Sequence, residues 1–333
     1  MIGETKKNPY LRPLDPRKDL NGVADLIDAC FDFQMDEDGR EYVRQIRRVA
    51  QSQNSLFGIG RNLGGTGVPM QGFVWEVDGK LVGNLTIIPF LRESKWNYLI
   101  ANVATYPDFR RQGIARQLTQ SALRFIRDRG GQIAWLQVRE DNQAAFDLYA
   151  SLGFHEIARR TTYHARPQTY KDSSTANTIS ITRRRSSDWP SQKAWLQRVY
   201  PPEIAWHLPF QVNNFQPGIW TRISQFFNDE SIFQWAARRS DRLLGVASLE
   251  FYRGNTDNLW LAVPPVLEED ALFSLLTHIR TEAPSQRTIS VNFPNGVAER
   301  CFQSAGYEKH VTLIWMNQST KQGHKKFSTE KLV

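Results

Sequence analysis

Two strand patterns with a helical pattern between them stand out in the first half of the chain. Residues 98–104 and 133–138 are short, mostly apolar runs of the kind that forms buried strands. Between them, apolar residues recur at helical spacing on one face, at Ile114, Leu118, Ala122, Phe125 and Ile126. The pattern predicts a strand, a loop, a helix and a second strand in that order.

The segments before this unit also have clear periodicity. Residues 10–14 and 178–182 are expected to be the first strands of two halves. Asp78 and Gly79 predict the turn of a hairpin with strands at 72–77 and 80–88. One helix is expected from the apolar stripe of Val23, Leu26, Ile27, Cys30 and Phe31, and a second over residues 39–50.

The loop that opens the central helix has the composition of an anion site. It reads Arg110, Arg111, Gln112, Gly113, Ile114 and Ala115, directly after a strand. The first N–H groups of a helix lack intrahelical acceptors and lie at the positive end of the helix dipole. Small residues at 113 and 115 allow close approach of a diphosphate, and arginine adds positive charge.

This loop resembles the pyrophosphate loop, R-x-x-G-x-A, of the GCN5-related N-acetyltransferase (GNAT) superfamily. A matching second motif follows, with Asn142, then Tyr149 seven positions on, then Gly153 and Phe154. The resemblance implies a mixed α/β sheet flanked by helices, acetyl-CoA as co-substrate and no metal. It also implies a set of cofactor-binding residues, namely Val103, Ala104, Thr105, Arg110, Arg111, Gln112, Gly113, Ile114, Ala115 and Asn142.

The same resemblance makes Tyr149 the candidate catalytic residue. A phenol with an ordinary pKa near 10 can protonate the departing CoA thiolate. A helix tyrosine packed in a core is the alternative interpretation, and plain N-capping is the alternative for Asn142. The general base stays open between Glu76, Glu93 and a water molecule held by Asn102.

The second half of the chain repeats the first. Asn295, Gly306 and Tyr307 follow one another with the spacing of Asn142, Gly153 and Phe154. The phosphate loop is missing, because residues 264–270 contain no glycine and three carboxylates, which repel a diphosphate. Phe302 stands where Tyr149 is expected. We therefore expect a degenerate GNAT-like domain, in which Asn295 is a helix N-cap.

These observations predict the domain organisation. The first domain, which binds acyl-CoA, is expected at residues 8–166, a linker at 167–177 and the degenerate domain at 178–317. A basic, disordered tail is expected at 318–333. The two domains would pack as an internal pseudo-dimer, with the second forming one wall of the acceptor cleft.

Composition narrows the class of protein. The net charge of +8 leaves an anionic partner open, but the basic residues concentrate at Arg183–Arg185 and in the tail, which does not favour nucleic-acid binding. No apolar run approaches the ~20 residues that span a bilayer. Cys30 and Cys301 are expected to be buried thiols in a cytoplasmic protein, and no histidines have metal-ligand spacing.

The sequence therefore favours an acetyl-CoA-dependent N-acetyltransferase that acetylates a primary amine by direct attack in a ternary complex. A small-molecule acceptor is the first hypothesis, and the acidic loop 32–38 would attract a cationic amine unless it is only a solvated loop. A protein N-terminus or lysine is the alternative acceptor, since the phosphate-loop half resembles ribosomal-protein acetyltransferases. A non-catalytic acyl-CoA sensor or interaction module is the other class. The glycines of 58–65 precede a strand pattern and predict a connection, not a dinucleotide loop.

Overall fold

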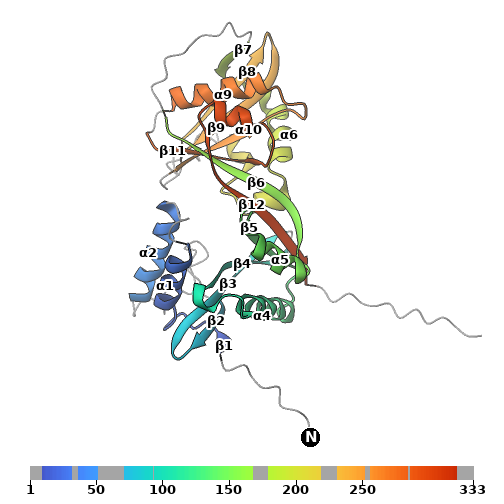
Figure 1. Ribbon diagram of the computed structural model, residues 1–333. Helices are drawn as coiled ribbons and strands as arrows, with labels where there is room; N and C mark the ends of the chain where they lie inside the picture. Colours follow the sequence, from blue (N-terminus) through green and yellow to red (C-terminus); the bar gives the residue numbers. More distant parts are fainter. Residues whose placement is uncertain are drawn as a thin grey trace, which may run out of the picture. The chain divides into compact units, whose positions relative to one another are not determined.

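The computed structural model describes residues 10–31, 37–51, 71–92, 94–167, 179–218, 231–251, 256–283 and 286–320, without the side chains of Glu37 and Asp38. These residues form two compact units (Figure 1). Unit 1 consists of residues 1–137, 142–156 and 316–333, and unit 2 of residues 138–141 and 157–315. Each unit is a mixed sheet with helices, and the chain therefore has the α/β class that its sequence predicts.

Unit 1 has five consecutive strands in the sheet order β1-β2-β3-β4-β5. The pairs β1–β2, β2–β3 and β3–β4 are antiparallel, whereas β4–β5 is parallel. The elements are β1 (Leu11–Pro13), α1 (Leu20–Phe31), α2 (Glu37–Gln51), β2 (Gly72–Val77), β3 (Lys80–Arg92), β4 (Lys95–Thr105), α4 (Ile114–Asp128), β5 (Ile133–Arg139) and α5 (Gln143–Ser151).

The helices of unit 1 cover both faces of this sheet. Phe73 on β2 packs edge-on against Phe125 of α4, at 6.0 Å between ring centroids. The next residue, Val74, belongs to the core cluster that α1 and α2 supply. Because successive strand residues point to opposite faces, α4 lies on one face and α1 and α2 on the other, as Figure 1 shows. Gly83 is required at the α4 face, since a Cβ there would lie 2.8 Å from Ile114 Cγ2.

Unit 2 repeats this plan with its own core. Its sheet order is β12-β6-β11-β10-β9-β8-β7, again with one parallel pair, β10–β11. The elements are β6 (His155–Ala165), β7 (Ile179–Arg183), α6 (Trp189–Val199), α7 (Pro202–Ala205), β8 (Ile232–Arg239), β9 (Arg242–Glu250), β10 (Thr256–Ala262), α9 (Glu269–Glu282), β11 (Thr288–Pro294), α10 (Glu299–Ser304) and β12 (Glu308–Ser319).

Each half of the sequence contributes a closing segment to the other unit. Ile157–Ala165 of β6 belong to unit 2, although the sequence pattern places them at the end of the first domain. Within this segment, Arg160–Ala165 pair with β11. Residues 316–320 at the end of β12 belong to unit 1. There the Thr320 N–H donates to Gln132 O at 3.0 Å, beside the start of β5. The domain limits 8–166, 167–177 and 178–317 stay a prediction.

The hairpin at Asp78–Gly79 and the buried Cys30 and Cys301 are confirmed. The prediction for Asn295 is wrong. The helix α10 begins at Glu299 after Gly296, whose φ is +75°, so that its N-cap is Ala298. The Asn295 side chain instead accepts a hydrogen bond from Thr161 Oγ1 at 2.8 Å.

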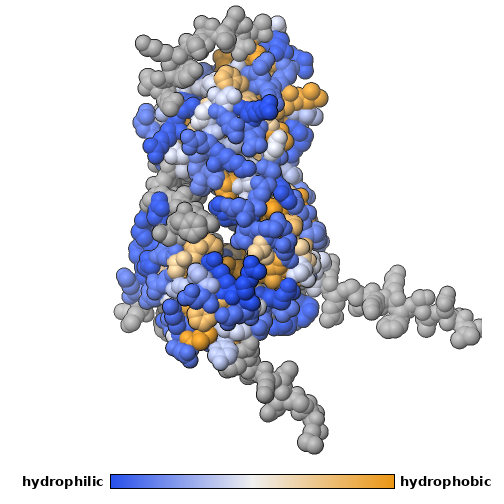
Figure 2. Space-filling model, viewed as in Figure 1, coloured by the Kyte–Doolittle hydropathy of each residue, from blue (hydrophilic) through white to orange (hydrophobic). Residues whose placement is uncertain are grey.

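Several predicted features lie outside the described residues. They are most of the acidic loop 32–38, the connection 58–65, Glu93, the linker from 168 and the tail from 321. Among the described residues, no helix is long and apolar enough to cross a membrane, and no metal-binding cluster is found. Figure 2 shows hydrophilic residues over most of the visible face, with hydrophobic ones in separate small patches.

We expect removal of residues 316–333 to destabilise unit 1, because it deletes the buried Met316 and the Thr320 hydrogen bonds to Gln132 O and Gly131 O. A fall of roughly 5–10 °C in the melting temperature corresponds to the loss of a few kcal/mol in a unit of this size. Scanning calorimetry of the shortened and full chains measures it.

A chain that ends at Thr320 is the matched control, since it keeps all these contacts. Equal melting of the 1–315 and 1–320 chains would contradict the role of the 316–320 segment.

Candidate active site

In unit 1, the neighbouring strands β4 and β5 separate after three residue pairs. Their parallel pairing is limited to Asn97–Ile133, Tyr98–Ala134 and Leu99–Trp135, whereas β4 continues to Thr105. Beyond Leu99, one edge of β4 therefore has no strand partner among the described residues. Its backbone N–H and C=O groups require another partner, because unpaired backbone polar groups in a protein interior are costly. The predicted cofactor-binding residues Val103, Ala104 and Thr105 lie on this stretch of β4.

A β-bulge deforms β4 at the same place. The register with β3 shifts between Asn84 and Thr86, so that Asn102 and Val103 together oppose Leu85. Asn102 has a φ of +52°, in the left-handed region. Its carbonyl accepts a hydrogen bond from Asn84 Nδ2 at 3.0 Å.

The Asn102 side chain is held as well. Its Nδ2 donates to the Tyr42 hydroxyl at 2.7 Å and approaches Thr86 Oγ1 at 3.4 Å. Burial raises the pKa of Tyr42, and the Asn102 hydrogen bond lowers it in part. Sequence reasoning identified Asn102 but missed Tyr42, Asn84 and Thr86. The available signal was two polar residues at alternate positions of the apolar strand β3.

The predicted phosphate loop connects β4 to α4. A single 3₁₀ turn at Pro107–Phe109 follows Tyr106, and Arg111 and Gly113 then have φ values of +63° and +77°. The first donor of the helical ladder is Gln117 N–H, which bonds Gly113 O at 3.0 Å. Within the described part of the chain, the backbone N–H groups of residues 111–116 have no acceptor. They form a row of donors at the positive end of a helix dipole.

The side chains around this loop secure its shape and keep it electropositive. Arg110 Nε and Cys30 Sγ both donate to Thr105 O, at 3.1 and 3.4 Å. Gln112 Nε2 donates to Asp108 O at 3.3 Å. Arg110 and Arg111 are exposed, and neither forms an ion pair with a described carboxylate. Since the Thr105 carbonyl is engaged twice, only its N–H remains for a ligand.

The helix α5 carries the other two predicted residues. Asn142 is its N-cap, and its side-chain oxygen accepts a hydrogen bond from Ala145 N–H at 3.1 Å. The capping interpretation is thus confirmed, and no described residue engages the Asn142 amide N–H₂. Arg116 Nη2 in the first turn of α4 donates to Ser151 Oγ at 2.8 Å and so ties α4 to the end of α5.

Tyr149 is buried, with 6% of its surface exposed, and its ring packs edge-on against Phe154. Burial raises its pKa well above the ordinary value, and its hydroxyl has no hydrogen-bond partner among the described residues. The phenol is therefore protonated at neutral pH. Packing in the core and a role as proton donor are both compatible with this position.

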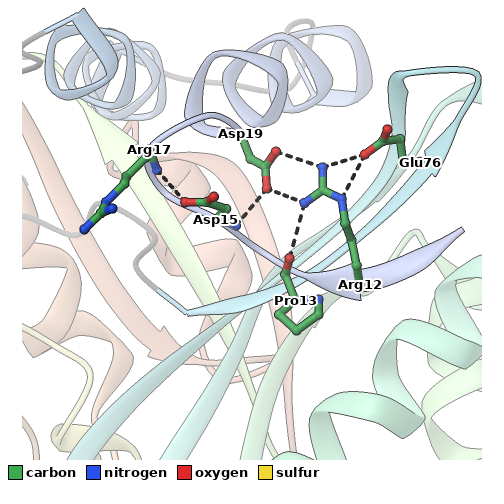
Figure 3. A network of polar contacts seen from close by, with 6 residues as sticks. All are labelled: Arg12, Pro13, Asp15, Arg17, Asp19 and Glu76. Carbon is green, nitrogen blue, oxygen red and sulfur yellow. Dashed lines mark hydrogen bonds and ion pairs between the residues drawn. The ribbon is translucent and has the colours of Figure 1, made fainter.

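Glu76, one of the candidate bases, belongs to a different network (Figure 3). Arg12 bridges Glu76, at 2.6 Å, and Asp19, at 2.7 Å. Burial alone would raise the pKa of Asp19, but hydrogen bonds from Arg12 and the Asp15 N–H lower it below its usual value. The network borders a cavity of about 400 Å³ next to Lys80 and Tyr106. The Glu76 carboxylate is thus already engaged by the Arg12 guanidinium.

Unit 2 differs from unit 1 at the places that match the bulge, the loop before α4 and Tyr149. Its β9 and β10 pair in one continuous register, without the bulge. The Leu261 N–H on β10 is satisfied internally, because it donates to the Tyr200 hydroxyl at 3.2 Å. Glu269 and Asp270 occupy the first turn of α9. Phe302, in place of Tyr149, stacks on Tyr163 at 4.3 Å.

Comparison with known proteins agrees with this geometry. The model of the acetyltransferase (GNAT) family matches residues 35–154. That segment belongs to the GNAT family. This GNAT domain contains the free edge of β4, the bulge, the predicted phosphate loop and Tyr149.

The GNAT domain has curated relatives in bacteria. The chain is 41% identical over 71 residues to the [ribosomal protein bS18]-alanine N-acetyltransferase of Salmonella typhimurium, which is 21% of this chain and 48% of that protein. It is 35% identical over 86 residues, 26% of this chain, to the N-alpha-acetyltransferase RimI of Mycobacterium tuberculosis, of which 52% is covered. The chain thus spans about half the length of these relatives.

Solved structures extend the likeness to both units. A GCN5-related N-acetyltransferase from Sphaerobacter thermophilus superposes with a TM-score of 0.57 at 14% identity, over 94% of this chain and 96% of that one. A tandem GNAT protein from the clavulanic acid biosynthesis pathway gives 0.50 at 14% identity, over 94% and 98%. At such identity the likeness shows the fold alone, which is a tandem arrangement of two GNAT-like folds.

We expect a Gly113→Glu substitution to weaken acetyl-CoA binding by about 100-fold or more, because a carboxylate at the head of α4 would repel the diphosphate. Isothermal titration calorimetry measures the affinity. Gly130→Glu is the matched control, since Gly130 has a φ of +71° at the other end of α4 and open space around it. Equal binding by both variants would contradict the assignment of the loop.

We expect Arg12→Met to destabilise the protein by about 2 kcal/mol at pH 7, because it leaves the carboxylate of Asp19 buried without its cation. The pKa of Asp19 is depressed in the folded state, so its stabilisation is present above about pH 4 and is lost as pH falls through the folded pKa. The difference in unfolding free energy between the variant and wild type should therefore shrink at pH 3. Urea unfolding at both pH values tests this.

Arg44→Met is the control for that measurement, because Arg44 pairs with Glu41 at an exposed site and such pairs contribute little. A loss in Arg12→Met as small as in Arg44→Met would contradict the role of the network.

Proposed function

We propose that unit 1 binds acetyl-CoA and transfers its acetyl group to a primary amine. The observation that carries this proposal is the row of unpaired N–H groups at residues 111–116, next to the free edge of β4. A diphosphate fits the first and an extended chain with amide groups fits the second. Pantetheine, which links the diphosphate of CoA to its sulfur, is such a chain.

The chain's own groups then have distinct tasks. The N–H groups of residues 111–116 hold the diphosphate, with charge from Arg110 and Arg111. Backbone groups of Val103 and the Thr105 N–H pair with the pantetheine as a neighbouring strand would, while the Ala104 backbone lies opposite Asn84 of β3. The free amide N–H₂ of Asn142 donates to it from α5. A backbone N–H at the bulge polarises the thioester carbonyl.

The reaction is a direct displacement. The amine nitrogen forms a bond to the thioester carbon, the carbon–sulfur bond breaks, and the pair of electrons remains on sulfur. The protonated Tyr149 gives its proton to that thiolate. The amine loses one proton to solvent, and solvent returns one proton to the Tyr149 phenolate. Holding both reactants in one complex supplies much of the acceleration. Because the Glu76 carboxylate is already bonded to Arg12, we assign the role of the base to a water molecule.

The acceptor divides this proposal into two classes. A small-molecule amine follows from the sequence, whereas the names of the curated relatives favour the α-amino group of a protein N-terminus. An α-amine has a pKa near 8 and a lysine side chain one near 10.4, so the former is far more often neutral and nucleophilic at pH 7.5. We therefore rank the α-amino group of a polypeptide as the second candidate and a lysine below it.

Unit 2 has a supporting role in this proposal. The bulge is absent, Tyr200 takes the Leu261 N–H, and acidic residues occupy the head of α9. Each removes one feature by which unit 1 would hold the cofactor. One acetyl-CoA per chain is the stoichiometry that follows.

We expect Tyr149→Phe to lower kcat by 10²–10⁴-fold, the range typical of a lost general acid, while the acetyl-CoA dissociation constant changes by less than about threefold. The assay follows thiol release with a panel of small amines and of peptides with free N-termini. Tyr98→Phe, which alters another buried tyrosine of unit 1, is the control and should keep its turnover.

Unchanged turnover in Tyr149→Phe would remove Tyr149 from the mechanism. Acetyl-CoA binding without turnover on any acceptor would favour the non-catalytic sensor. Activity on peptides but on none of the small amines would identify a polypeptide as the acceptor.

A further inference from the structure

We propose that Asn84 and Tyr42 are positioning residues that hold Asn102 in its left-handed conformation, and thereby fix the bulge of β4 against which the thioester carbonyl lies. This inference rests on the proposed function, because it concerns the carbonyl of the same acetyl-CoA. It adds residues outside the phosphate loop and α5. None of them needs to touch the cofactor.

The geometry gives each residue a separate hold on Asn102. Asn84 is fully buried on β3, and its Nδ2 donates to the Asn102 carbonyl. That acceptor can only be an oxygen, which fixes the orientation of the Asn84 amide. Tyr42, on α2, accepts from Asn102 Nδ2 at 2.7 Å, with the buried Thr86 hydroxyl beside it at 3.4 Å. Main chain and side chain of Asn102 are thus held from two different elements.

The held conformation is unfavourable by itself. A residue with a Cβ loses energy in the left-handed region, and asparagine tolerates it better than most. Such a conformation persists where surrounding contacts enforce it, and these positions concentrate at functional sites. Loss of the Asn84 or Tyr42 hydrogen bond therefore allows β4 to relax toward a regular register with β3. The backbone groups of Val103–Thr105 would then change direction.

Unit 2 provides an internal comparison. Both units have the same register shift in the preceding hairpin, between Trp75 and Glu76 in unit 1 and between Ala237 and Arg238 in unit 2. Gly83 and Gly245 pair with the residue before that shift and are therefore equivalent. Valine follows Gly245 where Asn84 follows Gly83. Unit 2 thus lacks the asparagine that holds the Asn102 carbonyl in unit 1, and its strand β10 pairs with β9 without a bulge.

One polar atom of the Asn84 side chain has no hydrogen-bond partner among the described residues. The Asn84 Oδ1 atom is buried and receives no hydrogen bond from the described residues. A buried acceptor without a donor is costly, so a bound water molecule suits this place.

The test compares the affinities for acetyl-CoA and S-ethyl-CoA, in which a CH₂ group replaces the carbonyl. Their ratio, measured by calorimetry without acceptor, reports how well the carbonyl is held. We expect wild type to prefer acetyl-CoA by about fivefold, the value of one typical hydrogen bond. Asn102→Ala and Asn84→Ala should reduce the ratio to about one, and Tyr42→Phe should reduce it in part.

Asn102→Gly is the decisive variant, because glycine adopts a φ of +52° without a side chain to hold it. It should keep the preference for acetyl-CoA and most of the turnover, whereas Asn102→Ala should lose about 10- to 100-fold in kcat with nearly unchanged affinity for S-ethyl-CoA. Asn97→Ala is the control, since the buried Asn97 lies on the same strand and, among the described residues, its side chain bonds only Lys95 O. It should leave the ratio unchanged.

The outcomes separate the two proposals. If Asn102→Gly is as impaired as Asn102→Ala, the asparagine side chain itself matters and the positioning role is overturned. A ratio that Asn84→Ala and Asn102→Ala leave unchanged overturns it as well. If the wild type binds both compounds but shows no turnover, only the proposed acetyl transfer is contradicted. The affinity ratio still tests the positioning role of Asn84 and Tyr42. Wild type that binds neither compound contradicts both.

Discussion

The parting of β4 and β5 after Leu99 and Trp135 is the constraint on which the rest of unit 1 depends. Backbone groups that leave a sheet without a partner have to find one elsewhere. On β4 this need is combined with a bulge at Asn102 and, a few residues later, with the unpaired N–H groups at the head of α4. The result is a continuous line of main-chain donors and acceptors. An extended ligand with a diphosphate at one end matches it.

Unit 2, the second copy of the repeat, shows how side chains of the same unit can bond such backbone groups. Unit 2 has the same order of elements, and the recorded pairing of β10 and β11 is equally short. There, Arg198 Nη2 donates to Val263 O and Pro264 O, and the Tyr200 hydroxyl accepts from the Leu261 N–H. Side chains of the unit itself thus satisfy groups that a ligand would otherwise engage. The fold persists because its core, around residues such as Leu275 and Phe302, does not depend on a ligand.

Local sequence predicted the features that local sequence determines. The glycine turn before α4, the N-cap at Asn142 and the amphipathic stripe of α4 are each set within a few residues. The prediction failed for Asn295, where a turn at Gly296 delays the helix by one turn. Features set by distant pairing were not visible. The bulge depends on the register of β3 against β4, and the orientation of the Asn102 side chain depends on Tyr42 of a separate helix.

The assignment of the closing segments to the two units also depends on pairing between segments that are distant in the sequence. Nothing in residues 157–165 or 316–320 by themselves indicates which sheet they join, since a strand pattern specifies a buried face but not a neighbour. The match of the GNAT family to residues 35–154 covers only the segment that carries the phosphate loop. The second unit is recognisable through its fold, because its loop and its tyrosine have changed.

Hydrogen–deuterium exchange with and without acetyl-CoA tests the central claim most directly, which is that unpaired main-chain groups in one of the two repeats hold the cofactor. The account predicts slower exchange in peptides that cover residues 100–105 and 111–116, and no change in residues 259–271. Unchanged exchange at residues 111–116 under saturating acetyl-CoA would contradict it. Equal protection of both repeats would also contradict it, because unit 2 would then bind the cofactor as well.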